Sequence, residues 1–172
     1  MNNAQLINQT SNEVEYFSPA AIVEAARRTM GGIDLDPASC KQANGVVKAT
    51  EYFTKDDDGL KQKWYGRVWV NWPFGRGRNK QWVDKIMTFF TEPGVEQLCC
   101  LCYACSSEQW FKPLLFRPQC FLTPRTNYLL PDGSVMRGVT KGSVVTYFGP
   151  NVDAFAREFL ALGVVKIPYS KV

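Results

Sequence analysis

The regular alternation of short apolar segments with amphipathic ones constrains the fold of this chain more than any other feature. The segments with strand patterns are residues 33–36, 51–54, 67–71, 97–103 and 164–167. The segments with helical patterns are residues 18–30, 42–47, 82–90, 106–115 and 151–162. Residues 120–148 have antiparallel strand patterns, with turns at 131–133 and 141–142. Strands that alternate with helices before a β-rich end favour an open α/β sheet, whose ligands bind at the carboxyl ends of the strands.

Local signals predict where two of the helices begin. Ser18 can cap the first helix, with Pro19 in its first position, and Gly31 and Gly32 stop it. Ser106 or Ser107 is expected to cap the helix that follows residues 97–103.

The length of 172 residues fits one domain, which we expect to cover residues 15–172. The polar segment 1–14 is rich in Asn and Gln and is expected to be a disordered tail. No apolar run approaches the roughly 20 residues of a membrane span. The N-terminus also lacks the apolar run of a signal peptide. These features predict a cytoplasmic protein without a membrane partner.

The chain contains no histidine. This excludes Ser-His-Asp and Cys-His hydrolases, most zinc enzymes and any mechanism that uses imidazole as a base. The formal net charge of +4 permits a nucleic-acid partner but does not demonstrate one. The chemistry must therefore depend on carboxylates, amides, backbone groups or a cofactor.

Four of the six cysteines crowd the segment from Cys99 to Cys105. One interpretation is a zinc-binding module. Zinc sites usually need two separated ligand pairs, however, and only Cys40 and Cys120 lie outside the cluster. We therefore favour a buried strand in which Cys acts as a small apolar residue, and we expect no metal.

The sequence Asn71-Trp72-Pro73-Phe74 breaks a strand and can form a site for a planar amino group. The Asn71 side-chain oxygen can accept one N–H of such a group, and the backbone carbonyl of residue 72 can accept the other. Together they would favour a more tetrahedral nitrogen and aim its lone pair at an incoming methyl group. Phe74 can stack on the base. The alternative interpretation of these four residues is a proline turn with a core aromatic ring.

An acidic strand tip and a basic loop accompany this turn. Asp36, followed by Pro37-Ala38-Ser39, can bind a cationic amino-acid moiety and leave space for its backbone, or else form a solvated loop. The basic residues that directly follow the turn can hold phosphates, and they are Arg76, Arg78 and Lys80.

In this order, these segments resemble the phage N-6-adenine-methyltransferase family, a group of small Dam-type enzymes. The matching segments are Tyr16–Pro19, Asp34–Ser39, Tyr52–Thr54, Asp58–Leu60, Trp64, Gly66, Val68–Phe74, Trp82-Val83, Ser107, Trp110-Phe111, Arg125 and Lys141–Ser143. They extend over nearly the whole chain after the polar tail. No single motif is highly specific, whereas their joint order and spacing are.

The resemblance implies a compact Rossmann-like methyltransferase sheet with an antiparallel C-terminal hairpin. It also implies S-adenosylmethionine as methyl donor and the exocyclic amino group of adenine in DNA as acceptor, with the flipped base held by residues 71–74. The residues implied for the cofactor are Tyr16, Phe17, Ser18, Pro19, Asp34, Asp36, Pro37, Ala38, Ser39 and Asp58. The residues expected to contact DNA are Arg76, Arg78, Lys80, Arg125 and Lys141. For a phage- or prophage-encoded enzyme, the expected location is the cytoplasm of the bacterial host, in a setting of restriction and modification.

Trp72 departs from the family, which usually has a second proline there. The carbonyl of residue 72 survives this change, so Trp72→Pro is expected to keep or improve activity. Two alternatives stay open. One is methylation of the cytosine exocyclic amine, and the other is a degenerate methyltransferase that binds DNA or a restriction factor without catalysis. Cofactor binding separates the second alternative from the two enzymes.

Overall fold

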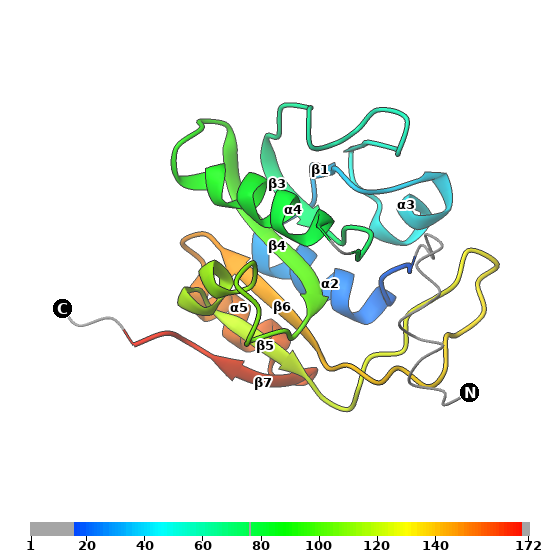
Figure 1. Ribbon diagram of the computed structural model, residues 1–172. Helices are drawn as coiled ribbons and strands as arrows, with labels where there is room; N and C mark the ends of the chain where they lie inside the picture. The colour runs from blue at the N-terminus through cyan, green and yellow to red at the C-terminus, as the bar shows by residue number, and fades with distance from the viewer. Residues whose placement is uncertain (1–15, 76, 170–172) are drawn as a thin grey trace.

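The computed structural model describes residues 16–75 and 77–169 (Figure 1). The strands are β1 (Leu35–Asp36), β2 (Glu51–Tyr52), β3 (Gly66–Val70), β4 (Val95–Tyr103), β5 (Gln119–Leu122), β6 (Ser143–Phe148) and β7 (Gly163–Lys166). The α-helices are α2 (Ala20–Met30), α3 (Lys41–Val47), α4 (Arg78–Met87) and α5 (Val152–Phe159). Two 3-10 helices are η1 (Thr88–Phe90) and η2 (Lys112–Phe116). The predicted tail at residues 1–14 lies outside the described residues.

All seven strands belong to one sheet, in the order β2-β1-β3-β4-β6-β5-β7. The half formed by β2, β1, β3 and β4 is parallel. β6 then pairs antiparallel with both β4 and β5, and β5 pairs antiparallel with β7. The structure therefore confirms a Rossmann-like α/β sheet with an antiparallel C-terminal part. The two strands of the expected hairpin, β5 and β6, are joined by a long loop at residues 123–142.

Apolar layers cover both faces of the sheet. On one face, α2 packs over β3 and β4, while α5 packs beside α2 over the antiparallel strands, with Phe155 stacked on Tyr147 of β6. Val47 of α3 joins the same layer. On the other face, α4 and η2 supply Trp82, Ile86 and Leu114. Figure 1 shows α2 and α4 on opposite sides of β3 and β4.

The cysteine-rich segment is the central strand β4. Its side chains alternate between the two layers, with Cys99 on the α2 side and Cys100 and Cys102 on the α4 side, all fully buried. This period of two is typical of a strand that is covered on both faces. The interpretation of a buried strand is confirmed, and within the described ranges no group of three or more His, Cys, Asp or Glu side chains is placed to hold a metal ion.

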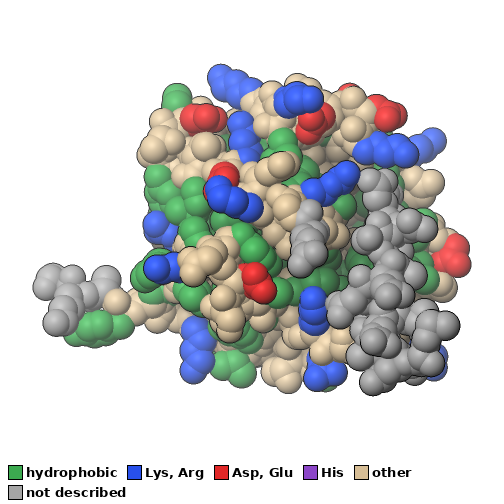
Figure 2. All heavy atoms as spheres, viewed as in Figure 1, with side chains coloured by type: hydrophobic (Ala, Val, Ile, Leu, Met, Phe, Trp, Pro, Cys, Tyr) green, Lys and Arg blue, Asp and Glu red, His purple; other side chains and the backbone are tan. Residues whose placement is uncertain are grey.

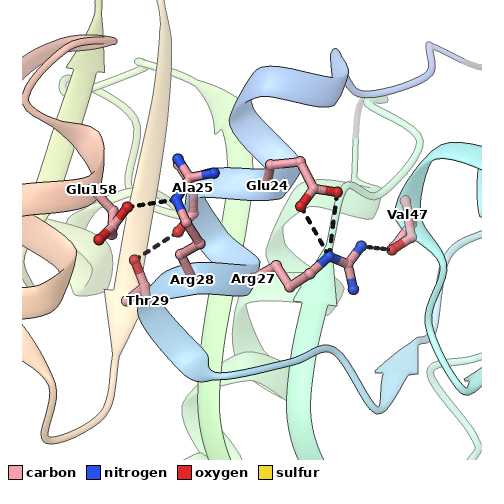
Figure 3. Close-up of polar contacts among 7 residues, drawn as sticks. All are labelled: Glu24, Ala25, Arg27, Arg28, Thr29, Val47 and Glu158. Atoms are coloured by element: carbon pink, nitrogen blue, oxygen red, sulfur yellow. Dashed lines mark hydrogen bonds and ion pairs between the residues drawn. The ribbon is translucent and has the colours of Figure 1, made fainter.

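Helix α2 is fixed by its apolar stripe and by polar contacts to its neighbours. Arg28 donates to the Glu158 carboxylate at 2.6 Å, and Arg27 donates to the carbonyl of Val47 (Figure 3). Gly31 ends the helix in the left-handed conformation, with a φ of 80°. The expected Ser18 cap is wrong, because Pro19 occupies the cap position and the Ser18 hydroxyl instead contacts Asn71.

The helix expected at residues 106–115 is also wrong. The segment forms successive tight turns, in which the amide of Phe111 donates to the carbonyl of Glu108 and the amide of Leu114 to that of Phe111, and it ends in η2. Pro113 lies inside the expected helix and has no N–H to donate, so an α-helical hydrogen bond is missing there.

The carboxyl ends of β1, β3 and β4 meet at one edge of the sheet. Because β6 is antiparallel to β4, its first residue, Ser143, pairs with Tyr103 at this same edge. The loop at residues 123–142 therefore also lies there, and its Leu129 forms a β-bridge to Phe17. Within residues 16–75 and 77–169, no helix has the length and apolar character needed to cross a membrane.

Candidate active site

A cavity of about 520 Å³ opens at this edge of the sheet. It is lined by the chain before α2, the loop after β1, the loop after β2 and the turn after β3, together with parts of α3 and α4. The predicted site residues that line it are Tyr16, Phe17, Ser18, Asp36, Pro37, Ala38, Ser39, Asp58, Asn71, Trp72, Pro73, Phe74 and Arg78. Its size lies in the range of cavities that hold drug-sized ligands. The structure thus brings most of the predicted residues together.

Asn71 follows the last residue of β3 and is held by the chain before α2. Its Nδ2 atom donates to the carbonyl of Tyr16 at 2.9 Å and to the Ser18 hydroxyl at 3.0 Å. A carbonyl oxygen can only accept, so the Tyr16 contact fixes which end of the amide is the nitrogen. The Oδ1 atom is buried and accepts no hydrogen bond from the described residues. A buried oxygen that accepts no hydrogen bond destabilises the folded protein, unless a ligand donates a hydrogen bond to it.

The rest of the turn has an aromatic backing. The Phe74 ring is 4.5 Å from the Tyr103 ring and 6.3 Å from the Tyr128 ring, measured between centroids. Tyr128 is buried and its hydroxyl hydrogen-bonds the Ser143 hydroxyl at 2.8 Å. The indole of Trp72 is almost completely buried in the α4 layer, so its bulk does not fill the cavity. Sequence reasoning missed Tyr103 and Tyr128, although Tyr103 ends a strand at the ligand-binding edge.

Asp36 ends β1 and lies at the buried wall of the cavity, with a relative exposure of 2%. Burial raises the pKa of its carboxyl group from 3.8 to about 7, and the hydrogen bond that it accepts from the Ala38 amide at 3.1 Å acts in the opposite direction. Nearby, the Ser39 hydroxyl is buried and makes no hydrogen bond of good geometry among the described residues, but it lies close enough to Asp36 to lower the pKa of that carboxyl group. A carboxylate and a neighbouring hydroxyl in one wall are suited to an amino-acid moiety.

The loop after β2 closes another side of the cavity. A side chain at Gly59 would place its Cβ 1.9 Å from the carbonyl oxygen of Pro37, so only glycine permits this close approach. Asp58, beside it, pairs with Lys61 at 2.9 Å, and this lysine lowers the pKa of the Asp58 carboxyl group. Further lining residues that sequence reasoning missed flank the predicted motifs, and they include Cys40, Lys55 and Gln81.

Two residues predicted for the cofactor lie outside the cavity. Asp34 precedes β1 and pairs with Arg67 through two oxygens at 2.7 and 2.8 Å, which lowers the pKa of the Asp34 carboxyl group. This geometry gives Asp34 a structural role. Pro19 is the cap residue of α2.

The residues predicted for DNA contact occupy two regions near the cavity. Arg78 and Lys80 lie on the first turn of α4, where Lys80 pairs with Asp84 at 2.6 Å. Arg125 donates to the carbonyl of Val139 at 3.4 Å, and Lys141 lies 5.7 Å above the Tyr103 ring. Arg76 lies outside the described residues.

The fold and the cavity define a small α/β domain with a ligand site at the strand tips, beside a turn that can hold a planar amine. A model of the DNA N-6-adenine-methyltransferase (Dam) family matches residues 8–119, and the chain belongs to this family. The match includes all the segments that line the cavity and ends at the first residue of β5. Comparison with curated proteins gave no match.

Proposed function

We propose that the chain transfers the methyl group of S-adenosylmethionine to the exocyclic N6 of an adenine that has been flipped out of DNA. Membership of the family gives the general activity, methylation of adenine in DNA. The assignment of residues depends on one observation above all. Asn71 presents a buried oxygen without a partner among the described residues, in the wall of the cavity and at a strand end.

At the base end, the Asn71 oxygen accepts one N6–H, and the carbonyl of Trp72 accepts the other. Two acceptors on one amino group draw its nitrogen toward a tetrahedral shape and leave its lone pair free for the methyl group. The N6 lone pair forms the new bond to carbon as the bond from that carbon to sulfur breaks, and one N6 proton then leaves to water. Phe74 stacks on the flipped base, with Tyr103 behind it.

At the cofactor end, the buried carboxylate of Asp36 pairs with the ammonium group of the methionine moiety. The neighbouring Ser39 hydroxyl, which also lines the cavity, donates to its carboxylate. These groups fit the cofactor because they supply one negative charge and one donor in a cavity of sufficient size. The cofactor itself supplies the methyl group on a positively charged sulfur.

Basic side chains of the described residues do not form one continuous patch on the viewed face. Figure 2 shows Lys and Arg side chains spread over the viewed face, with acidic side chains among them. Phosphate contacts therefore have to come from individual basic residues near the cavity. We propose Arg78 and Lys80 beside the turn, and Arg125 and Lys141 in the loop that reaches the same edge.

The test is methyl transfer from labelled S-adenosylmethionine to unmodified DNA, followed by nucleoside analysis. We expect N6-methyladenine with the wild-type chain, and a rate that is lower by about two to three orders of magnitude with Asn71→Ala. The matched control is Gln109→Ala, which removes an exposed amide outside the cavity and should leave the rate unchanged. Wild-type rates in Asn71→Ala would refute this role for the turn.

The same assay separates the alternatives. If the product is N4-methylcytosine, the target base is cytosine and not adenine. The family match argues against this outcome. Absence of both donor binding and methylated product would favour a degenerate binding protein. The buried position of the Trp72 indole argues against that alternative, because the departure from the family leaves the cavity open.

A further inference from the structure

We infer that Asn79 is a positioning residue for the base-holding turn and acts through the indole of Trp72. The inference rests on the proposed function of that turn. The Trp72 Nε1 atom donates to the Asn79 Oδ1 atom at 2.9 Å, and the indole is 1% exposed. Asn79 itself lies in the first turn of α4, outside the cavity lining.

Asn79 holds the chain at two points. Its backbone amide donates to the carbonyl of Gly75 at 3.4 Å, beside the amide of Arg78, which donates to the same carbonyl at 3.2 Å. Its side chain reaches further back, to Trp72. Trp72, the second residue of the turn, and Gly75, which follows the turn, are therefore both hydrogen-bonded to the start of α4.

This hydrogen bond restricts the turn at the position where the family usually has a second proline. A proline at position 72, as in the family's usual pattern, would restrict the backbone through its ring, whereas tryptophan leaves φ free. The indole is instead fixed by its hydrogen bond and by two edge-on ring contacts, to Phe74 at 6.1 Å and to Trp110 at 6.5 Å. The carbonyl of Trp72 is the proposed second acceptor for the amine, so an indole that cannot move also restricts that acceptor.

The location on α4 connects the turn to DNA binding as well. Asn79 stands between Arg78 and Lys80, the two residues proposed to contact phosphates. One turn of helix thus carries both the phosphate contacts and the hydrogen bond that fixes the base-holding turn.

The experiment compares Asn79→Ala, Trp72→Phe and the double variant in single-turnover methylation. Asn79→Ala removes the acceptor and Trp72→Phe removes the donor while keeping an aromatic ring. We expect either change to lower the rate roughly two- to tenfold, as for the loss of one ordinary hydrogen bond. The double variant should be no slower than the slower single variant, because both changes remove the same contact. Asn79→Asp keeps an acceptor oxygen and should restore most of the rate.

Further readouts separate positioning from general damage. Donor affinity and the salt dependence of DNA binding should be unchanged in Asn79→Ala, since Asn79 contacts neither ligand in the proposed complex. The indole N–H resonance of Trp72 should shift in Asn79→Ala and return toward the wild-type position in Asn79→Asp.

Two outcomes would overturn the inference. One is a wild-type rate in both Asn79→Ala and Trp72→Phe, and the other is a multiplicative loss in the double variant. Asn71→Ala is measured in parallel. If it is inactive while both other variants are fully active, only the role of Asn79 fails. If it is fully active, the proposed function of the turn fails. Should Asn79→Ala not fold, Trp72→Phe and Asn79→Asp still provide the test.

Discussion

The Asn71 amide nitrogen donates to the hydroxyl of Ser18 at 3.0 Å, across 53 residues of sequence. Ser18 is buried, at 4% exposure, and directly precedes the cap residue of α2. The same nitrogen donates to the carbonyl of Tyr16, so both of its protons are used. The chain before α2 thus orients the amide whose oxygen faces the proposed amine.

Replacing Ser18 with alanine should therefore slow methyl transfer without abolishing it. One of the two bonds that orient Asn71 is lost and the Tyr16 contact stays, so we expect a fall of roughly three- to tenfold in the single-turnover rate. The control is Ser106→Ala, which removes an exposed hydroxyl outside the cavity. Donor affinity is measured separately, since Ser18 also lines the cavity. An unchanged rate would show that Tyr16 alone orients the amide.

Asp36→Asn should stabilise the folded protein at alkaline pH. The folded-state pKa of Asp36 is about 7, above its ordinary value of 3.8, so the folded chain retains a proton that the unfolded chain has lost. The stability that Asp36 contributes is therefore lost as the pH rises from about 4 through 7. Asn stays neutral at both pH values. We therefore expect Asp36→Asn to change the free energy of unfolding more favourably near pH 8 than near pH 4, by at most about 4 kcal/mol. Urea denaturation of both proteins at each pH provides the measurement. If the substitution has the same effect on stability at the two pH values, the prediction is wrong.

Donor binding should depend on pH through the same carboxyl group. An ammonium group beside Asp36 favours the carboxylate, so below the pKa of about 7 the donor has to displace a proton. We expect affinity to fall about tenfold for each pH unit below that pKa, and nearly one proton to be released per donor bound at about pH 6. Calorimetry in buffers of different ionisation enthalpy measures this release. Asp36→Asn should bind the donor more weakly and release no proton, whereas release at the wild-type level would point to another group.

The sequence predicts which polar side chains share the cavity where each one ends a strand. Asp36 and Asn71 each stand at the end of a short strand, and parallel strands bring their carboxyl ends to one edge, so both residues line a single cavity. The alternating burial of Cys99 and Cys100 likewise follows from a strand that is covered on both faces.

The remaining contacts depend on the packing of segments that are distant in sequence. Asp34 and Asp36 are equivalent in the sequence pattern. In the structure, Asp34 forms an ion pair with Arg67 on the neighbouring strand, whereas Asp36 lines the cavity. Ser18 suits a helix cap, but the nearby Asn71 amide draws its hydroxyl elsewhere. Local propensity cannot distinguish these outcomes, since each depends on a partner more than 30 residues away.

Removal of the basic residues on α4 should weaken DNA binding independently of sequence. Lys80 pairs with Asp84 in an exposed ion pair, which contributes little and can exchange for a phosphate contact. In the variant with both Arg78→Ala and Lys80→Ala, we expect the slope of log affinity against log salt concentration to fall by about two units. Lys166→Ala, on β7 and exposed, is the control and should leave the slope unchanged. An unchanged slope in the double variant would exclude phosphate contacts at these two positions.

Trp72→Pro provides the sharpest contrast between sequence and structure. By sequence alone the change restores the family's usual turn and should keep or improve activity. In the structure, however, the indole is buried, contacts Trp110 and Phe74, and donates to Asn79. Its removal leaves a cavity and an unpaired acceptor, so we expect a loss of about 3–5 kcal/mol in the free energy of unfolding.

Urea denaturation and methylation at low temperature test this prediction together. The remaining folded molecules keep the carbonyl of residue 72 but lose the contact that restricts it, so their rate should fall as well. A variant as stable as the wild type would contradict the buried position of the indole. A variant that is both stable and faster would show that a second proline restricts the backbone of the turn better than the contacts of the indole with Asn79 and the surrounding rings.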